Sequence, residues 1–301
     1  MVFETKQPDY PGAYSLERVY GDCEGTVKMR RNFAQVLREG KVDIHREYSK
    51  LYSLFYGKDN RDEKSIADII SSNFQLIPFR GTCIDLEDFD ETHGLNFVEQ
   101  PRDFNVDYLI DFCEYIYNFV LCLEPHYFFH SFSQSDFLDQ ILRVIEAVGY
   151  MSVCKDGCTI FVPKNSAAIA VSESSFVPEH VSYKIISYDH HSMKGQLEDK
   201  KSTLLRFASI LEGKRSDLKS INKNLESDLF YLFNNLNIRH NNVNSNDSKY
   251  KAYVAKMSCN ELEHWYDETY QMCLLAILEL EHKERKADLD ELKSKIESAQ
   301  K

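Results

Sequence analysis

An asparagine-rich segment around Arg239 and His240 carries the residues best suited to chemistry. Seven of the thirteen residues from 234 to 246 are asparagine. Asparagine is a poor helix-interior residue, because its side chain competes for backbone hydrogen bonds. Arginine binds phosphate through two parallel hydrogen bonds, and histidine exchanges a proton near neutral pH. These are the groups that a protein needs to cleave RNA without a metal ion.

When the 2′-hydroxyl of RNA attacks the adjacent phosphate, the reaction needs a general base, a general acid and positive charge beside the phosphate. We assign His240 as the general acid or base and Arg239 as the group that stabilises the phosphate. A symmetric dimer would supply two copies of each. We expect Asn235, Asn241 and Asn242 to orient the histidine or bind phosphate oxygens. The alternative is that the whole segment forms a buried polar turn that closes a helix bundle.

The helices that precede this segment offer a local source of positive charge. Arg206 and Arg215 are the candidate substrate-binding arginines. The lysines that accompany them are Lys200, Lys201, Lys214, Lys219 and Lys223. Acidic residues are interspersed, so the patch only suggests nucleic-acid binding. The net charge of the chain is -12, so most of its surface repels nucleic acid.

Composition is that of an ordinary globular protein. The chain has 301 residues, of which 43% are hydrophobic and 28% charged. No secretion signal and no apolar run long enough to span a membrane is evident, so we expect a cytoplasmic protein with reduced cysteines. The eight cysteines contain no C-x-x-C pair, which argues against structural zinc. No nucleotide-binding glycine motif is present, and we expect no cofactor.

Three other groups of residues could bind a metal ion or support an active site. Two Glu-x-x-His pairs, at 261–264 and 279–282, lie too far apart on one predicted helix to share a centre. The acidic segment 85–91 is a candidate for a metal-dependent nuclease, although a solvated loop is the simpler interpretation. His190 and His191 close a predicted helix, where the helix dipole favours histidine. A capping pair is expected there, with support of an active site as the alternative.

Periodicity predicts a mainly helical chain. The predicted helices of the first half span residues 27–38, 44–56, 62–74, 107–123 and 136–148. No helix is expected at 77–106. Asp156-Gly157 between two β-prone runs predicts a hairpin at 150–162. A three-residue loop there would place Cys154 opposite Cys158.

Helices are expected again from Pro178 onward. They span residues 180–191, 196–212 with Gly213 as the C-cap residue, and 214–238. A capping box at 258–261 then opens a long terminal helix. The tail of that helix carries Leu289, Leu292 and Ile296 among mixed charges, so we expect it to pack on a partner or to project freely.

The segment from about 150 to 280 resembles the HEPN-like C-terminal domains of abortive-infection proteins. The resemblance rests on the hairpin, on residues 204–212, on Leu-Asn-Ile-Arg-His-Asn-Asn at 236–242 and on residues 265–270. It implies a helical bundle that dimerises and often acts as a metal-independent ribonuclease in phage defence or toxin–antitoxin systems. The family motif is an arginine, often followed by a polar residue, then four to six residues and a histidine. Here Asn235 stands at that distance from His240, and Arg239 lies next to the histidine.

The sequence therefore predicts two parts, an N-terminal helical domain of unknown role at 1–140 and a hairpin plus HEPN-like bundle at 141–301. The leading hypothesis is a homodimeric antiviral ribonuclease, with tRNA as one candidate substrate. The alternative is a non-catalytic HEPN-like sensor, antitoxin or scaffold that acts through protein partners.

Overall fold

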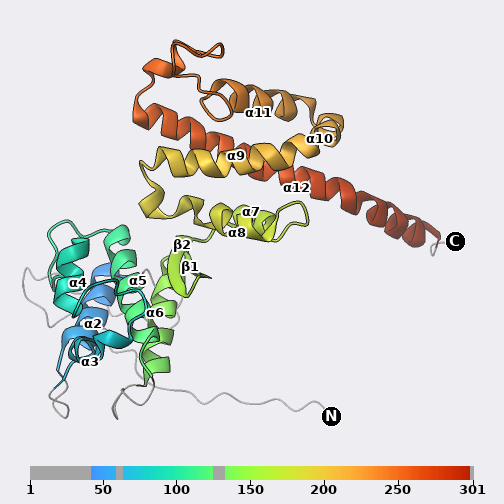
Figure 1. Cartoon of the computed structure of the whole chain (residues 1–301). Coiled ribbons are helices and arrows are strands. Elements are labelled where there is room, and N and C mark those ends of the chain that lie inside the picture. The colour runs from blue at the N-terminus through green and yellow to red at the C-terminus, as the bar shows by residue number, and fades with distance from the viewer. Residues whose placement is uncertain (1–41, 59–63, 125–132, 299–301) are drawn as a thin grey trace, which may run out of the picture. The chain divides into compact units, whose positions relative to one another are not determined.

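The computed structural model describes residues 42–58, 64–124 and 133–298, and Val42–Lys301 form one compact unit. Its described part is mainly helical with one antiparallel hairpin, as the sequence predicts (Figure 1). The predicted helix at 27–38 lies outside the described residues. None of the described helices is long and apolar enough to cross a membrane.

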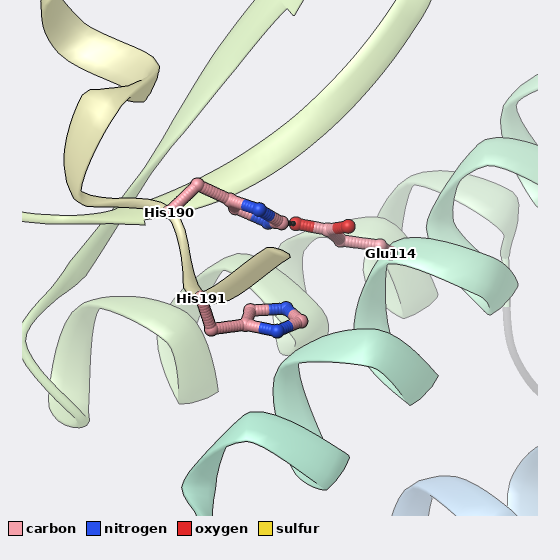
Figure 2. Close-up of side chains that lie close together, drawn as sticks. All are labelled: Glu114, His190 and His191. Carbon is pink, nitrogen blue, oxygen red and sulfur yellow. Dashed lines mark hydrogen bonds and ion pairs between the residues drawn. The ribbon is translucent and has the colours of Figure 1, made fainter. Parts of the chain in front are cut away.

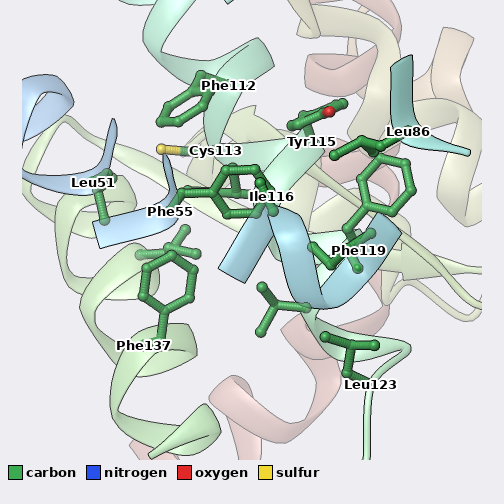
Figure 3. Close-up of a cluster of buried hydrophobic side chains, with 14 of the residues drawn as sticks. Leu51, Phe55, Leu86, Phe112, Cys113, Tyr115, Ile116, Phe119, Leu123 and Phe137 are labelled. Atoms are coloured by element: carbon green, nitrogen blue, oxygen red, sulfur yellow. The ribbon is translucent and has the colours of Figure 1, made fainter. Parts of the chain in front are cut away.

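Helices α2 to α6 surround the first of two clusters of buried side chains. Their bounds are α2 Ile44–Tyr56, α3 Ile66–Ser72, α4 Leu86–His93, α5 Val106–Leu121 and α6 Gln134–Ala147. Phe112, Cys113, Ile116 and Phe119 of α5 are at most 1% exposed, and they lie among aromatic and aliphatic side chains of the neighbouring helices (Figure 3). The strongly apolar pattern of α5 therefore reflects burial on several sides.

The hairpin of β1 (Tyr150–Lys155) and β2 (Cys158–Pro163) confirms the Asp-Gly prediction. Asp156 and Gly157 have φ angles of 53° and 81°, which a two-residue primed turn requires. The loop has two residues, and not the three that would place Cys154 opposite Cys158. Lys155 pairs with Cys158, and Cys154 pairs with Thr159, so the two cysteines do not face each other across the ladder.

The remaining helices enclose the second cluster of buried side chains. Their bounds are α7 Ser166–Ser172, α8 Glu179–Ile186, α9 Leu197–Gly213, α10 Arg215–Ile221, α11 Lys223–Asn235 and α12 Cys259–Ser298, with short 3-10 turns η3 Ser187–Asp189 and η4 His191–Met193. Helices α9 and α11 both pack on α12 (Figure 1). Tyr270 of α12 stacks on Tyr188, with ring centroids 3.9 Å apart, and its hydroxyl donates to the carbonyl of Ile185.

Several predicted helix bounds are wrong because polar side chains cap helices where the sequence pattern runs on. The helix predicted at 214–238 is two helices, since Asn222 caps α11 by accepting from the N–H of Leu225. The helix predicted at 62–74 begins only after Ser65, which forms a capping box with Asp68. The helix predicted at 180–191 ends at Ile186, and Gly213 is the last residue of α9 and not its cap.

Two short helices lie where none was predicted. Helix α4 occupies the acidic segment, because Asp85 caps its first turn and Gly94 adopts a left-handed φ of 65° at its end. Helix α7 follows Asn165, whose side chain accepts from two backbone N–H groups. In both cases one side-chain cap is enough to start a helix that lacks a long apolar stripe.

Helix α12 begins at Cys259, close to its predicted start, and continues without a break to Ser298. Its first half packs on the second cluster. Its tail from His282 is exposed, including Leu289, Leu292 and Ile296, which are 41%, 53% and 52% exposed. The tail is therefore a helix with three large apolar side chains that no described part of the chain covers.

Candidate functional site

The asparagine-rich segment ends α11 and reverses the chain. Helix α11 stops at Asn235, and Asn237 adopts a left-handed φ of 56°. Asparagine tolerates that conformation better than most residues. The N–H of Arg239 then donates to the carbonyl of Phe233 at 2.9 Å. The unusual composition thus serves a helix terminus.

Asn242 is the centre of this turn. It is 0% exposed. Its Oδ1 accepts from the N–H of Asn237 at 2.7 Å, and its Nδ2 donates to the carbonyls of Asn234 at 3.2 Å and Lys249 at 2.7 Å. A side chain with these three partners holds the loop together and has no face left for a substrate.

The guanidinium of Arg239 is engaged within the bundle. It forms an ion pair with Glu212 of α9 and donates to the carbonyl of Ala208 at 2.8 Å. It also lies over the rings of Phe230 and Phe233, at 5.3 and 5.5 Å from their centroids. Arg239 therefore fastens the loop after α11 to α9.

The other predicted site residues are dispersed. Arg215 donates to Glu226 at 2.6 Å and covers the ring of Phe230, while Arg206 is exposed on α9. Asn235 donates to the carbonyl of Tyr231 within its own helix. The half-buried His240 and the exposed Asn241 have no side-chain hydrogen bond or ion pair to any residue that the structure describes. His240 is thus next to Arg239 in sequence but has no contact that would orient it for proton transfer.

The acidic segment at 85–91 also serves the fold. Asp85 caps α4, and Asp88 accepts from the N–H of Ile84 at 2.9 Å. Asp90 accepts from the hydroxyl of Tyr115 at 3.1 Å. Burial of Asp90 raises the pKa of its carboxyl to about 6, although the bond from Tyr115 opposes this shift. Asp85 and Asp88 thus serve the start of α4, whereas Glu87, Asp90 and Glu91 line one pocket together with Asp68 of α3.

A different group of side chains converges around His190 and His191. Within the described ranges, Glu114 of α5 and these two histidines are the only three His, Cys, Asp or Glu residues whose ligand atoms all lie within 4.8 Å of one another (Figure 2). His190 and His191 are 7% and 14% exposed at their side chains, and Glu114 is 16% exposed. The histidines come from the turns between α8 and α9, 76 residues from Glu114 in sequence.

The hydrogen bonds of His190 assign its tautomer. Its Nδ1 lies 3.2 Å from the N–H of Ser192, which can only donate, so Nδ1 is the acceptor. Its Nε2 then carries the proton and donates to Oε1 of Glu114 at 2.9 Å. The same Glu114 oxygen accepts from the N–H of Phe161 in β2 at 2.6 Å. One carboxylate thus ties together α5, the hairpin and the turn after α8.

His191 faces a second carboxylate of α5. Its Nε2 lies 3.1 Å from Oδ1 of Asp111, one helical turn before Glu114. The nearby carboxylate of Asp111 raises the pKa of His191, although burial opposes this shift. Two carboxylates on one face of α5 therefore confront two adjacent imidazoles.

A polar pocket of about 330 Å³ adjoins the histidines. Its lining residues are Asp107, Tyr150, Tyr188, Asp189, His190, His191, Lys194, Lys200 and Asp267. Lys200 is 6% exposed. It forms ion pairs of 2.8 Å with Glu263 and 2.7 Å with Asp267. The lysine that the sequence offered as part of a basic patch is therefore neutralised in this pocket.

The sequence marked the histidine pair but missed Glu114 and Asp111. Both acids interrupt an otherwise strongly apolar helix, and a carboxylate in such a helix needs a partner when it is buried. The presence of these two carboxylates in an apolar helix was the signal that the sequence offered. The partner itself could not be found from the sequence, because it lies 76 residues away.

No protein-family model, curated protein or solved structure matches this chain. The resemblance to HEPN-like domains therefore remains a prediction from the residues quoted above.

Proposed function

We propose that this chain is a non-catalytic helical binding module that dimerises through α12 and acts through protein partners, in the manner of a HEPN-like sensor or antitoxin. The observation that carries the proposal is that the guanidinium of Arg239 is bound to groups of its own chain. A guanidinium that stabilises a scissile phosphate must have its donors free for phosphate oxygens. In Arg239 the Nη2 group instead binds Glu212 and the carbonyl of Ala208, and the carboxylate of Glu212 offsets the charge that a phosphate would need.

The surroundings of Arg239 support the same conclusion. Arg215 is paired with Glu226. Asn242 is buried with three hydrogen-bond partners. RNA binding at this end of the bundle would require several of these contacts to break, in a chain whose net charge of -12 opposes the approach of a polyanion.

The exposed seam of α12 supplies a surface for a second copy of the chain. Four exposed apolar side chains of α12 follow a seven-residue repeat. Its first core position is occupied by Leu275, Leu289 and Ile296, and its second core position by Leu292. These four side chains are 41–53% exposed. A seven-residue apolar repeat on an exposed helix face is typical of a coiled-coil seam.

Charges beside the seam favour a second copy in parallel orientation. In a parallel coiled coil, position g, just before the first core position a, faces position e, just after the second core position d, of the partner helix. Glu281 then faces Lys286 of the partner subunit, and Asp288 faces Lys293 of the partner subunit. Both pairs are of opposite charge. His282 and Arg285 occupy core positions of the same repeat, which lowers the stability of the pair but fixes its register.

Substitution of Arg239 and His240 tests the choice between module and nuclease. We expect Arg239→Ala to lower the free energy of unfolding by about 2 kcal/mol, because it removes a partly buried hydrogen bond and contacts with two rings. His240→Ala should change it by less than about 0.5 kcal/mol. Denaturant unfolding measures both. Incubation of the wild type with total RNA and tRNA in EDTA should leave the RNA intact. Metal-independent cleavage that His240→Ala abolishes would overturn the proposal in favour of a ribonuclease.

Substitution in the seam tests the dimer. Leu292→Asp places a charge at a core position, so we expect the mass measured by light scattering to fall from that of two chains to that of one. Ser294→Asp adds the same charge two residues later, on the outer side of the helix, and should leave the mass unchanged. Equal masses for the wild type and both variants would exclude this seam as the interface.

A further inference from the structure

We propose that Glu114, His190 and His191 form a binding site for a divalent transition-metal ion of the zinc class. Two imidazole nitrogens and one carboxylate are a donor set that suits zinc with a further position open. The three ligand atoms already lie within 4.8 Å of one another and are largely shielded from solvent. The inference concerns a different end of the second cluster from Arg239 and does not depend on the proposed function.

The spacing of the donors is close to what zinc requires. Zinc binds nitrogen and oxygen at about 2.0–2.2 Å, so neighbouring donors of a tetrahedral site are roughly 3.3 Å apart. Nε2 of His190 and Oε1 of Glu114 are 2.9 Å apart. The third donor, from His191, lies within 4.8 Å of both. In Figure 2 the rings of His190 and His191 both approach Glu114 from one side.

The residues behind the donors fit a metal site. Binding through Nε2 of His190 moves its proton to Nδ1, which then donates to the hydroxyl of Ser192, 2.7 Å away, and gives up the bond that it accepts from the N–H of Ser192 at 3.2 Å. The N–H of Phe161 holds one oxygen of Glu114. Contacts of this kind orient metal ligands and set their affinity.

The charge balance also favours a cation. Glu114, whose side chain is 16% exposed, faces two imidazoles, and a largely buried charge is stabilised only when it is compensated. Asp111 lies 3.1 Å from Nε2 of His191 and is the nearest further carboxylate. A divalent ion at Glu114, His190 and His191 compensates both acids and joins α5 to the turns before α9.

Zinc titration of the full-length chain without a histidine tag tests the site. After dialysis against EDTA and its removal, we expect calorimetry to show one tight zinc ion per chain, and Co²⁺ to give the intense visible absorption of a four-coordinate ion. His191→Ala should weaken zinc binding by about 100-fold or more. Ser192→Ala should weaken it by about tenfold, as loss of a supporting hydrogen bond does.

Two controls keep the outcome decisive. His264→Ala removes an exposed histidine of α12 and should bind zinc like the wild type. Thermal unfolding without metal should show that His191→Ala is folded, because the substitution removes the contact with the half-exposed Asp111 and the ring contact with His190 but no hydrogen bond to the backbone. If Glu114→Gln and His191→Ala bind zinc as tightly as the wild type, or if the wild type binds none, the site does not exist and the cluster is only a structural contact.

Discussion

Asn242→Ala is expected to lower the free energy of unfolding by about 3 kcal/mol. The side chain makes three hydrogen bonds at a position that is 0% exposed. Each buried hydrogen bond contributes about 1 kcal/mol net, and a partner left unsatisfied adds to the loss. Alanine leaves the N–H of Asn237 and two carbonyls without their acceptor or donor. Urea denaturation of the purified variant measures the change.

Asn241→Ala is the matched control. Asn241 is the preceding residue, it is exposed, and its side chain has no hydrogen bond to the described residues, so the change in unfolding free energy should be below about 0.5 kcal/mol. A substrate-binding role predicts a different pattern, in which both variants fold normally and both bind RNA less tightly. Equal stability of the two variants would therefore contradict the structural role of Asn242.

Local chemistry explains which parts of the fold the sequence predicts. The hairpin follows from Asp156-Gly157, because few other pairs adopt two positive φ angles. The bounds of α2 are as predicted, since its apolar positions repeat at helical spacing and Asp43 caps its first turn. In each case the decisive residues are within a few positions of the element they determine.

The errors arise where a polar side chain has two interpretations. Asn222 reads as a surface residue within one long helix, but it caps α11 and its Nδ2 donates to Glu279 of α12 at 3.1 Å. Asp85 reads as part of a solvated acidic loop, but it starts α4. Which interpretation holds depends on the direction of the chain before the cap, and that direction is set by tertiary packing.

The candidate sites depend on contacts that the sequence does not encode locally. The pairing of Arg239 with Glu212 joins two helices, and the pairing of Glu114 with His190 spans 76 residues. The sequence indicates which side chains have chemistry to offer. It does not show that Arg239 pairs with Glu212 of the same chain, or that Glu114 lies beside His190 and His191.

Lys200→Ala is expected to lower the free energy of unfolding by about 3 kcal/mol at neutral pH. Lys200 is 6% exposed and binds both Glu263 and Asp267. Loss of one partner from a buried ion pair costs about 3–5 kcal/mol, and the lower value applies because Asp267 is 46% exposed. Lys201→Ala, at the next position, should change the stability by less than about 0.5 kcal/mol.

The dependence on pH separates this electrostatic loss from a loss of packing. Burial raises the pKa of Glu263, but the bonds from Lys200 and from the N–H of Gly195 outweigh it and lower the pKa below 4.5. A lowered acid pKa stabilises the fold above the ordinary pKa, and this contribution disappears as the pH falls through the folded value. For Lys200, burial lowers the pKa, but the bonds to Asp267 and Glu263 outweigh it and raise the pKa above 10.5. Its contribution is therefore complete below pH 10.5 and is lost as the pH rises further.

The stability difference between the wild type and Lys200→Ala should therefore be largest from about pH 5 to pH 10 and should shrink as the solution becomes more acidic. Lys200→Met keeps most of the aliphatic stem and removes the charge, so it should show the same pH dependence with a slightly smaller loss. Lys200 also lies 5.3 Å from the centroid of the Tyr188 ring. If the loss in Lys200→Ala is the same at pH 3 and pH 7 and Lys200→Met restores it, packing of the stem on that ring stabilises the fold and the ion pairs do not.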